Sequence, residues 1–278
     1  MKGRVVITGM GTVNPLGHDV EGTWTAMLAG KSGITPIELF DAVTYPTRFA
    51  AQVKGFDLAS QVPDAARHAN AGRHCRFALG AAVQAWRQSG LDRCELDRRR
   101  LAIYLGSGEG NIDYAAANSL MIDAWKGTPT DGALDKRAWA ALAFTRHDLY
   151  REVEQEANMV VAHLAAEFGV RGPAVNVLTA CAASTQALGD AAGRIPAAAM
   201  TGAMGSLFAG AGGVELAVAS MALKTGIVPP TVNFASPAKG CELNLSPQAR
   251  RADIKHVVTG AFAVGGQSAA CVLRHYEG

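Results

Sequence analysis

The chain has 278 residues, of which 49% are apolar, so it can bury a sizeable core as one large domain or two small ones. Its 26 Lys and Arg residues are balanced by 24 Asp and Glu residues, which leaves a formal charge of +2. This balance argues against nucleic acid or a membrane surface as a partner. No apolar run approaches the ~20 residues that a membrane-spanning helix needs.

The first nine residues, MKGRVVITG, contain an apolar run that is too short for a signal-peptide core and indicates a strand instead. The five cysteines are scattered, odd in number and without a CxxC pair, which is typical of free thiols in a reducing compartment. The seven histidines stand singly, with no pair at metal-ligand spacing. We therefore expect a cytoplasmic protein without a metal site.

The glycines after the first strand bear on cofactor binding. Gly9-Met10-Gly11 resembles the start of a dinucleotide-binding fingerprint, which needs a third glycine three positions after the second. Asn14 stands at that position. The pattern therefore favours a tight turn after a strand, and we expect no cofactor.

Helices and strands alternate along the rest of the chain. Apolar periodicity followed by glycine predicts helices at residues 21–28, 77–86, 160–168 and 212–225. Apolar runs predict strands at residues 101–105, 256–262 and 269–273 and just before Cys181, with an extended segment at 231–234. Residues 112–152 are more polar and indicate helices that suit a lid. The alternation predicts an α/β fold.

The stretch NVLTACAASTQALG, residues 176–189, places Cys181 between a predicted strand and a predicted helix at residues 182–194. The N–H groups that begin a helix stabilise a thiolate, and they can also hold the oxyanion that forms when it attacks a thioester. The flanking residues Ala180, Ala182 and Ala183 leave room for an acyl chain. Composition alone nevertheless favours a buried structural cysteine over a nucleophile, because free cysteines usually lie in cores.

Three stretches together resemble one enzyme family. VVITGMGTVNPLG near the N-terminus, NVLTACAAST around Cys181, and the tail from GAGGVELAVASMALKTGIVPPTVN to VGGQS are similar to β-ketoacyl-acyl-carrier-protein synthases. These are condensing enzymes of the thiolase-like superfamily. The matches come in the family's order, and residues 1–195 resemble its N-terminal part and residues 196–278 its C-terminal end. The resemblance implies one thiolase-like domain over residues 1–278, with a layered α/β/α/β/α architecture that lacks a middle segment.

The resemblance also implies a reaction and partners. Cys181 would accept an acyl group from a phosphopantetheine-linked acyl carrier protein, and the enolate of a malonyl thioester would then attack the acyl-cysteine. The backbone N–H groups of Cys181 and, in the turn before Gly265, of Val264 would form the oxyanion hole. Two family histidines would donate hydrogen bonds to the malonyl thioester. A homodimer, or a heterodimer with another condensing enzyme, is implied as well.

The chain departs from the family after the cysteine helix. Residues 189–195 run directly into residues 196–213, so the middle portion that carries the first histidine is absent. The second histidine stands in a K-x-x-x-G-H pattern, in which Thr201 replaces the lysine here and Ser206 replaces the histidine. Val264 replaces the phenylalanine of the C-terminal turn. Because losing one such donor typically lowers a rate by about 10²–10³-fold, we expect condensation to be impaired.

Three functions remain open from the sequence. The chain is an acyltransferase of fatty-acid or polyketide biosynthesis, with Cys181 as the acyl acceptor. Alternatively, it is an impaired homologue that only transfers acyl groups or acts as a non-catalytic partner subunit. A third reading is an inert, shortened α/β domain.

Overall fold

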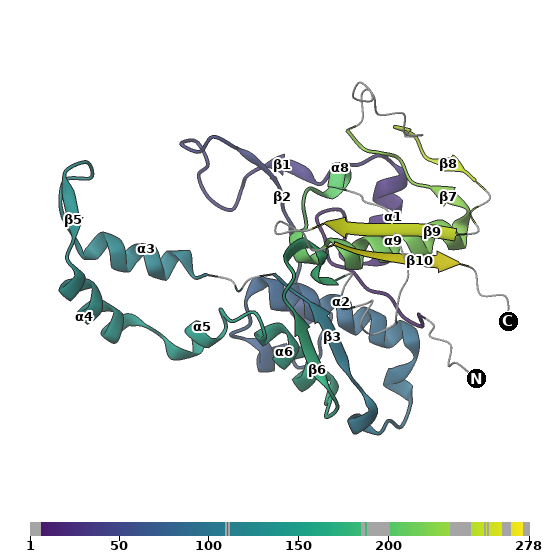
Figure 1. Cartoon of the computed structure of the whole chain (residues 1–278), viewed down its shortest axis with the longest axis horizontal. Coiled ribbons are helices and arrows are strands. Elements are labelled where there is room, and N and C mark those ends of the chain that lie inside the picture. The colour runs from purple at the N-terminus through teal and green to yellow at the C-terminus, as the bar shows by residue number, and fades with distance from the viewer. Residues whose placement is uncertain are drawn as a thin grey trace.

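The computed structural model describes residues 7–108, 110, 112–184, 187, 201–233, 246–252, 254, 256–262 and 268–274. In these residues, helices and short strands form a body from which one long arm projects (Figure 1). The strands that are described pair two by two.

One half of the body is built on the parallel strands β3 (Ile103–Gly106) and β6 (Ala174–Val177). Helix α6 (Met159–Phe168) packs on both strands, and α2 (Arg73–Ser89) packs on α6. Buried apolar side chains from both helices form one core cluster. Each helix ends at a left-handed glycine, Gly90 with φ 74° and Gly169 with φ 59°, a conformation that glycine adopts without a Cβ clash.

The other half of the body pairs α1 (Val20–Leu28) with α9 (Ala211–Thr225). Asp19 caps α1 by accepting a hydrogen bond from the backbone N–H of Gly22 at 2.6 Å. The antiparallel strands β9 (His256–Phe262) and β10 (Ser268–Arg274) lie against α9 (Figure 1). Half of the buried positions of α9 hold glycine or alanine, which lets neighbouring backbone approach closely.

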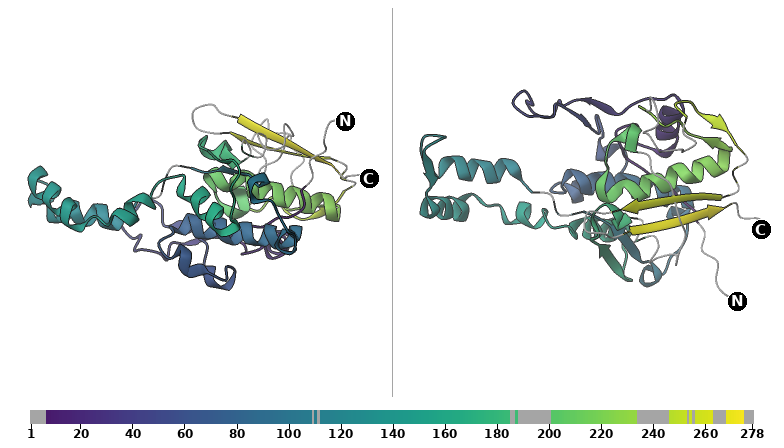
Figure 2. Two further views of the ribbon diagram at one scale, coloured as in Figure 1. Left: turned by 90° about the horizontal axis from the view of Figure 1, so that it is seen from below. Right: turned by 45° about the horizontal axis from the view of Figure 1, so that its top comes forward.

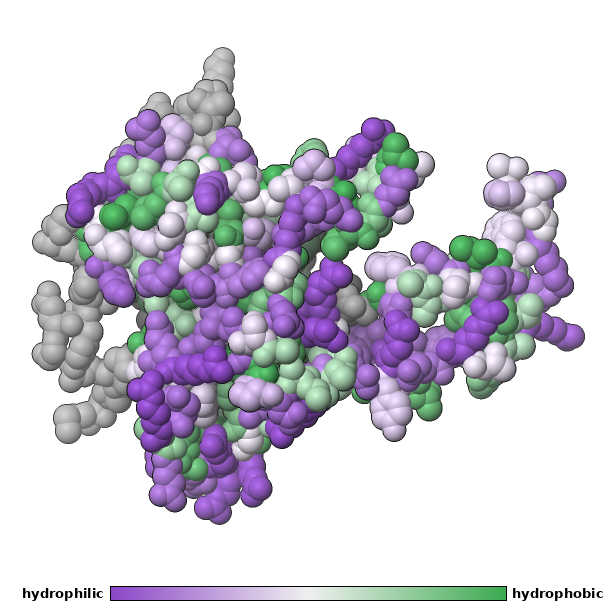
Figure 3. All heavy atoms as spheres, turned by 180° about the vertical axis from the view of Figure 1, so that it is seen from behind, coloured by the Kyte–Doolittle hydropathy of each residue, from purple (hydrophilic) through white to green (hydrophobic). Residues whose placement is uncertain are grey.

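The arm is a helical hairpin that extends away from the body in two views (Figure 1, Figure 2). It consists of α3 (Tyr114–Asp123), β4 (Trp125–Gly127), β5 (Gly132–Leu134), α4 (Lys136–Arg146) and α5 (Leu149–Val153). Hydrophilic and hydrophobic residues are interspersed over its surface (Figure 3), and Phe144 is 93% exposed. The helices expected at residues 112–152 are therefore present, but they project from the body instead of covering it as a lid.

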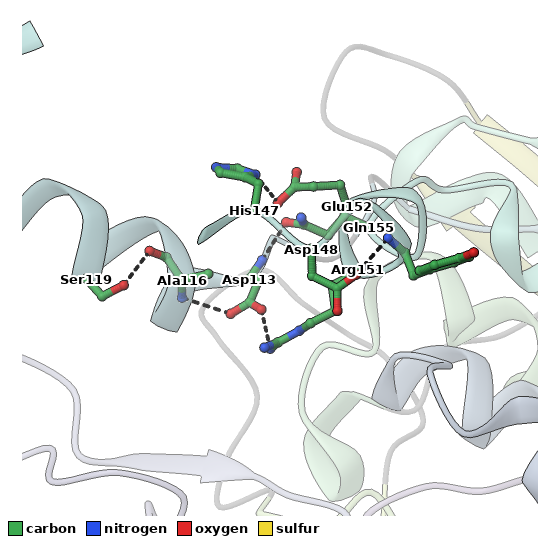
Figure 4. A network of polar contacts seen from close by, with 9 residues as sticks. Asp113, Ala116, Ser119, His147, Asp148, Arg151, Glu152 and Gln155 are labelled. Carbon is green, nitrogen blue, oxygen red and sulfur yellow. Dashed lines mark hydrogen bonds and ion pairs between the residues drawn. The ribbon is translucent and has the colours of Figure 1, made fainter. Parts of the chain in front are cut away.

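Polar contacts hold the two sides of the arm together at its base (Figure 4). The backbone N–H of Asp113 donates to Gln155 Oε1 at 2.6 Å, and the Asp113 carboxylate accepts from the backbone N–H of Ala116 at 3.0 Å. Arg151 forms an ion pair with the same carboxylate. Asp113 therefore caps α3 and ties it to the segment after α5.

The remaining elements are short. They are β1 (Ile34–Pro36), β2 (Phe49–Ala51), β7 (Ile227–Val228), β8 (Arg250–Arg251), α8 (Thr201–Met204), and the 3-10 turns η1 (Leu58–Ser60), η2 (Ala65–His68), η3 (Leu91–Arg93), η4 (Arg98–Arg100), η5 (Ala180–Ala182) and η6 (Phe208–Gly210). Among the helices described, none has the length and apolar character needed to cross a lipid bilayer.

The other expected elements that fall within the described residues are present, with two further corrections. Helix α2 begins four residues before the predicted start at residue 77. The segment expected to be extended at residues 231–234 instead turns at 232–233, where Asn233 has φ 63°, and residue 234 lies outside the described part. Asparagine tolerates this left-handed conformation better than most residues do.

Candidate functional site

Cys181 lies in a tight turn at the carboxyl end of β6. The strand ends at Val177, and Cys181 is the middle residue of the 3-10 turn η5. Its thiol is free and the residue is partly exposed, whereas the free thiol of Cys75 is fully buried. Of these two cysteines, Cys181 is therefore the one partly open to solvent.

The residue before the cysteine has a strained backbone. Ala180 has φ 49°, in the left-handed region that an L-residue with a Cβ atom enters at a cost of about 1–2 kcal/mol. Such a conformation persists only where the surrounding structure holds it, and it is concentrated at functional sites. The strain at Ala180 supports the hypothesis that this turn presents Cys181 for chemistry.

Close packing holds the turn in place. Gly106, the last residue of β3, lies very close to residues 183–184, which follow the cysteine turn. A Cβ atom added to Gly106 would stand 2.0 Å from the backbone nitrogen of Ser184. The Ser184 hydroxyl donates to the carbonyl oxygen of Ala209 in η6. Turn η5 also contacts α9 and β9. Glycine is thus required at position 106, because the backbone next to the cysteine turn occupies the space of a side chain.

The substituted family positions lie on the segment that reaches η6. Thr201 is the first residue of α8, and Ser206 is exposed between α8 and η6. Gly205, with φ 70°, makes the bend between them. Because η6 contacts η5, the fold brings this segment beside the cysteine turn. Val264 and most of the helix predicted at residues 182–194 lie outside the described residues.

The described surroundings of Cys181 contain no histidine partner. Among the described side chains, no hydrogen bond joins Cys181 to an imidazole, and His163 bonds instead to His68 and Glu154. Thr179 Oγ1, two residues before the cysteine, is buried without a hydrogen-bond partner in the described part of the chain. This arrangement offers an accessible thiol and backbone N–H groups but, within these residues, no imidazole donor.

Comparison with known proteins identifies the family. The model for the β-ketoacyl synthase N-terminal domain matches residues 2–225, a span that includes β3, β6 and the cysteine turn. The chain belongs to the β-ketoacyl synthase family. The resemblance of its motifs to condensing enzymes of fatty-acid or polyketide synthesis is therefore confirmed.

Curated relatives of this β-ketoacyl synthase family chain include 3-oxoacyl-[acyl-carrier-protein] synthase 2 of Coxiella burnetii, 34% identical over 191 residues, and that of Vibrio cholerae, 33% identical over 192 residues. Each alignment covers 69% of this chain and 42% of the relative, so the chain matches less than half the length of these enzymes.

Solved ketosynthase structures share the fold. The ishigamide ketosynthase/chain length factor has a TM-score of 0.77 at 17% identity, covering 98% of this chain and 99% of the other. A β-ketoacyl synthase from Burkholderia phymatum has a TM-score of 0.75 at 16% identity, covering 99% and 100%. The expected thiolase-like α/β fold is thereby confirmed.

One group of polar residues could not be found from sequence spacing. His68 and His163, 95 positions apart, lie with their Nδ1 atoms 2.9 Å from each other. His68 Nε2 lies 3.0 Å from Glu167 Oε2, and His163 Nε2 lies 2.9 Å from Glu154 Oε2. The histidines that stand singly in the sequence are therefore paired in the fold. The only sequence signal is local: Glu167 follows His163 by four residues on α6.

Proposed function

We propose that this chain accepts an acyl group on Cys181 from the phosphopantetheine thioester of an acyl carrier protein. The observation that carries the proposal is the position of Cys181, in a strained and partly exposed turn directly after β6, within the matched family region. The reaction is a thioester exchange. The Cys181 sulfur bonds to the carbonyl carbon, the pantetheine sulfur leaves, and the proton of the Cys181 thiol ends on the pantetheine thiol.

Backbone N–H groups would stabilise the oxyanion of this exchange. The N–H of Cys181 itself is one donor, and the family resemblance assigns the second to Val264. Donors fixed in position before the reaction are worth about 2.7–4 kcal/mol each, because they need no reorganisation as charge develops. The close packing of Gly106 against residues 183–184 supplies such fixation for the first donor.

Carbon–carbon bond formation requires more than this thiol. Decarboxylation of a malonyl thioester develops an enolate, which family members stabilise with imidazole donors. Ser206 and Thr201 occupy the matching histidine and lysine positions here. We therefore propose that acyl transfer persists and that condensation is slower by at least about 10²–10³-fold than with an intact donor set.

The proposed partner is an acyl carrier protein in a reducing cytoplasm, where Cys181 stays a free thiol. One structural neighbour is described as a type II polyketide synthase acyl-carrier protein in complex with its ketosynthase. A second copy of this chain or another condensing enzyme would complete the assembly. We propose further that residues 1–278 act as one thiolase-like unit.

Acyl transfer is tested by mass spectrometry. The chain is mixed with a carrier protein loaded with a saturated acyl group, and the increase in intact mass is followed by peptide mapping. We expect one acyl group per chain on Cys181, which neutral hydroxylamine removes because it cleaves thioesters, and none in Cys181→Ala. Cys94→Ala is the matched control, because Cys94 is an exposed free cysteine outside the site.

Two outcomes would contradict the proposal. Acylation of Cys94 at the same rate as Cys181 would show non-specific thiol chemistry. No adduct at all, together with iodoacetamide reactivity of Cys181 equal to that of a simple thiol, would favour a non-catalytic partner subunit or an inert domain.

A further inference from the structure

A buried cluster of histidine, cysteine and glutamate side chains lies where α2, η2 and α6 meet, on elements other than the cysteine turn. His68 is 1% exposed, His163 9%, and Cys75 0%. Hydrogen bonds run in a chain from Glu167 to His68, from His68 to His163, and from His163 to Glu154. So many ionisable groups in a core are costly unless each has a partner.

The number of protons in this series of hydrogen bonds bears on whether the cluster could hold a cation. Three hydrogen bonds link the four groups, and each needs one proton between its two heavy atoms. Two neutral imidazoles carry two protons, which serve two of the three hydrogen bonds. A cation between His163 and Glu154 would replace the third hydrogen bond and leave each imidazole with one proton.

Cys75 supplies a third ligand type at the same place. Its Sγ atom, one carboxylate oxygen of Glu154 and one ring nitrogen of His163 all lie within 4.8 Å of one another. These three side chains offer a sulfur, an oxygen and a nitrogen ligand to one cation, and the cysteine would bind as a thiolate because metal ligands are deprotonated.

His74 adds an independent observation. Its Nε2 atom lies 3.4 Å from Cys75 Sγ, and its Nδ1 atom is buried without a hydrogen-bond partner in the part of the chain that the structure describes. An unsatisfied buried nitrogen beside a buried thiol is costly in the metal-free protein, and rotation of the ring would offer it as a fourth ligand.

We propose that Cys75, Glu154 and His163 form a Zn²⁺ site, with His74 as the fourth ligand and with His68 and Glu167 as supporting residues. Thiolate, imidazole and carboxylate are the ligands that zinc prefers in proteins, at about 2.0–2.3 Å from the metal. His163 would bind through Nε2 and donate its Nδ1 proton to His68, whose Nε2 proton goes to Glu167. Such an outer chain from histidine to carboxylate fixes the ring orientation in known zinc sites.

Formation of the site needs small movements and releases protons to solvent. Atoms within 4.8 Å of one another must approach to roughly 3.5 Å around a tetrahedral zinc ion. Glu154 is the C-terminal cap residue of α5, and its side chain and that of His163 are 14% and 10% exposed. The proton of the Cys75 thiol and the proton between His163 and Glu154 leave as zinc binds. The ion would join the base of the arm to α2 and α6.

The first test uses the whole purified chain, without substitutions. Co²⁺ is added after treatment with a chelator, and the near-ultraviolet absorption is recorded. We expect a thiolate-to-cobalt charge-transfer band at one equivalent per chain, which Zn²⁺ removes by displacement. A Co²⁺ titration with no such band would overturn the proposal, whatever the variants do.

Variants locate the metal. Cys75→Ala should abolish the charge-transfer band, and Glu154→Gln should weaken zinc binding by more than 100-fold in competition with a chromogenic chelator. His68→Gln should weaken it by about 10–100-fold while the band persists, as expected for a positioning residue. Cys94→Ala is the control and should bind as the unmodified chain does. If the band survives in Cys75→Ala, the metal lies elsewhere and the proposal is wrong.

Discussion

The packing of Gly106 against the cysteine turn makes a prediction that links stability to chemistry. In Gly106→Ala the new Cβ atom would lie 2.0 Å from Ser184 N and 2.1 Å from the carbonyl carbon of Ala183. Real Cβ atoms essentially never come within 3.0 Å of such atoms, so strand and turn must separate by at least 3.0 − 2.0 = 1.0 Å. Overpacking of this kind costs about 1–3 kcal/mol, and contact with backbone places it at the upper end.

Both consequences can be measured on the same preparation. Because a domain of this size loses about 2 °C in Tm per kcal/mol, Gly106→Ala should melt about 6 °C below the unmodified chain. A displacement of 1 Å at a reacting group costs about 10²-fold in rate, so acylation of Cys181 should slow by about that factor.

A second glycine gives the matched control. Gly213, in α9, has no atom within 4 Å of an added Cβ and no positive φ. Gly213→Ala should therefore leave acylation unchanged and stabilise the chain by up to about 1 kcal/mol. If Gly106→Ala melts and acylates as the unmodified chain does, the proposed role of this packing in presenting Cys181 is wrong.

Three further predictions concern the core, the arm and the proposed zinc site. Leu79→Ala removes a fully buried side chain between α2 and α6 and should lower the free energy of unfolding in urea by about 2–5 kcal/mol; a loss below 1 kcal/mol would contradict the core assignment. Asp113→Ala removes the cap of α3 and the ion pair with Arg151, so the free energy of local opening, measured by amide hydrogen exchange in α3, should fall by about 1 kcal/mol. An equal fall in α2 would show that the arm is not a separate unit of stability. Zn²⁺ at a hundred times its Kd should stabilise the chain by about 2.7 kcal/mol and leave Cys75→Ala unaffected; equal stabilisation of both would place the ion elsewhere.

Local signals in the sequence predicted most of the helices. Apolar periodicity ended by Gly90, Gly169 and Gly226 gave α2, α6 and α9, because a left-handed glycine stops a helix through local geometry alone. The strand before Cys181 was equally local. The N-terminal extension of α2 was missed, because Arg73, His74 and Arg76 carry no apolar period. Arg76 donates instead to the carbonyl oxygens of Ala71 and Ala69, before the helix.

Other features depend on contacts that are remote in sequence. His68 meets His163 across 95 positions, so no spacing rule could reveal the pair. The direction of the arm was also missed, since a polar helical segment can cover a body or project from it with the same composition. At the candidate site, motif resemblance located Cys181, but the strain at Ala180 and the approach of Gly106 appear only in three dimensions.

The central claim is that Cys181 holds an acyl group that the chain does not efficiently extend. One reaction tests it most directly: the chain, acyl-loaded carrier protein and malonyl-loaded carrier protein are mixed, and the masses of all three proteins are followed over time. The account predicts that acyl-Cys181 accumulates and persists while neither carbon dioxide nor a ketoacyl carrier forms at a comparable rate. Rapid turnover of acyl-Cys181 with stoichiometric ketoacyl product would contradict it, and so would a chain that never acquires the acyl mass.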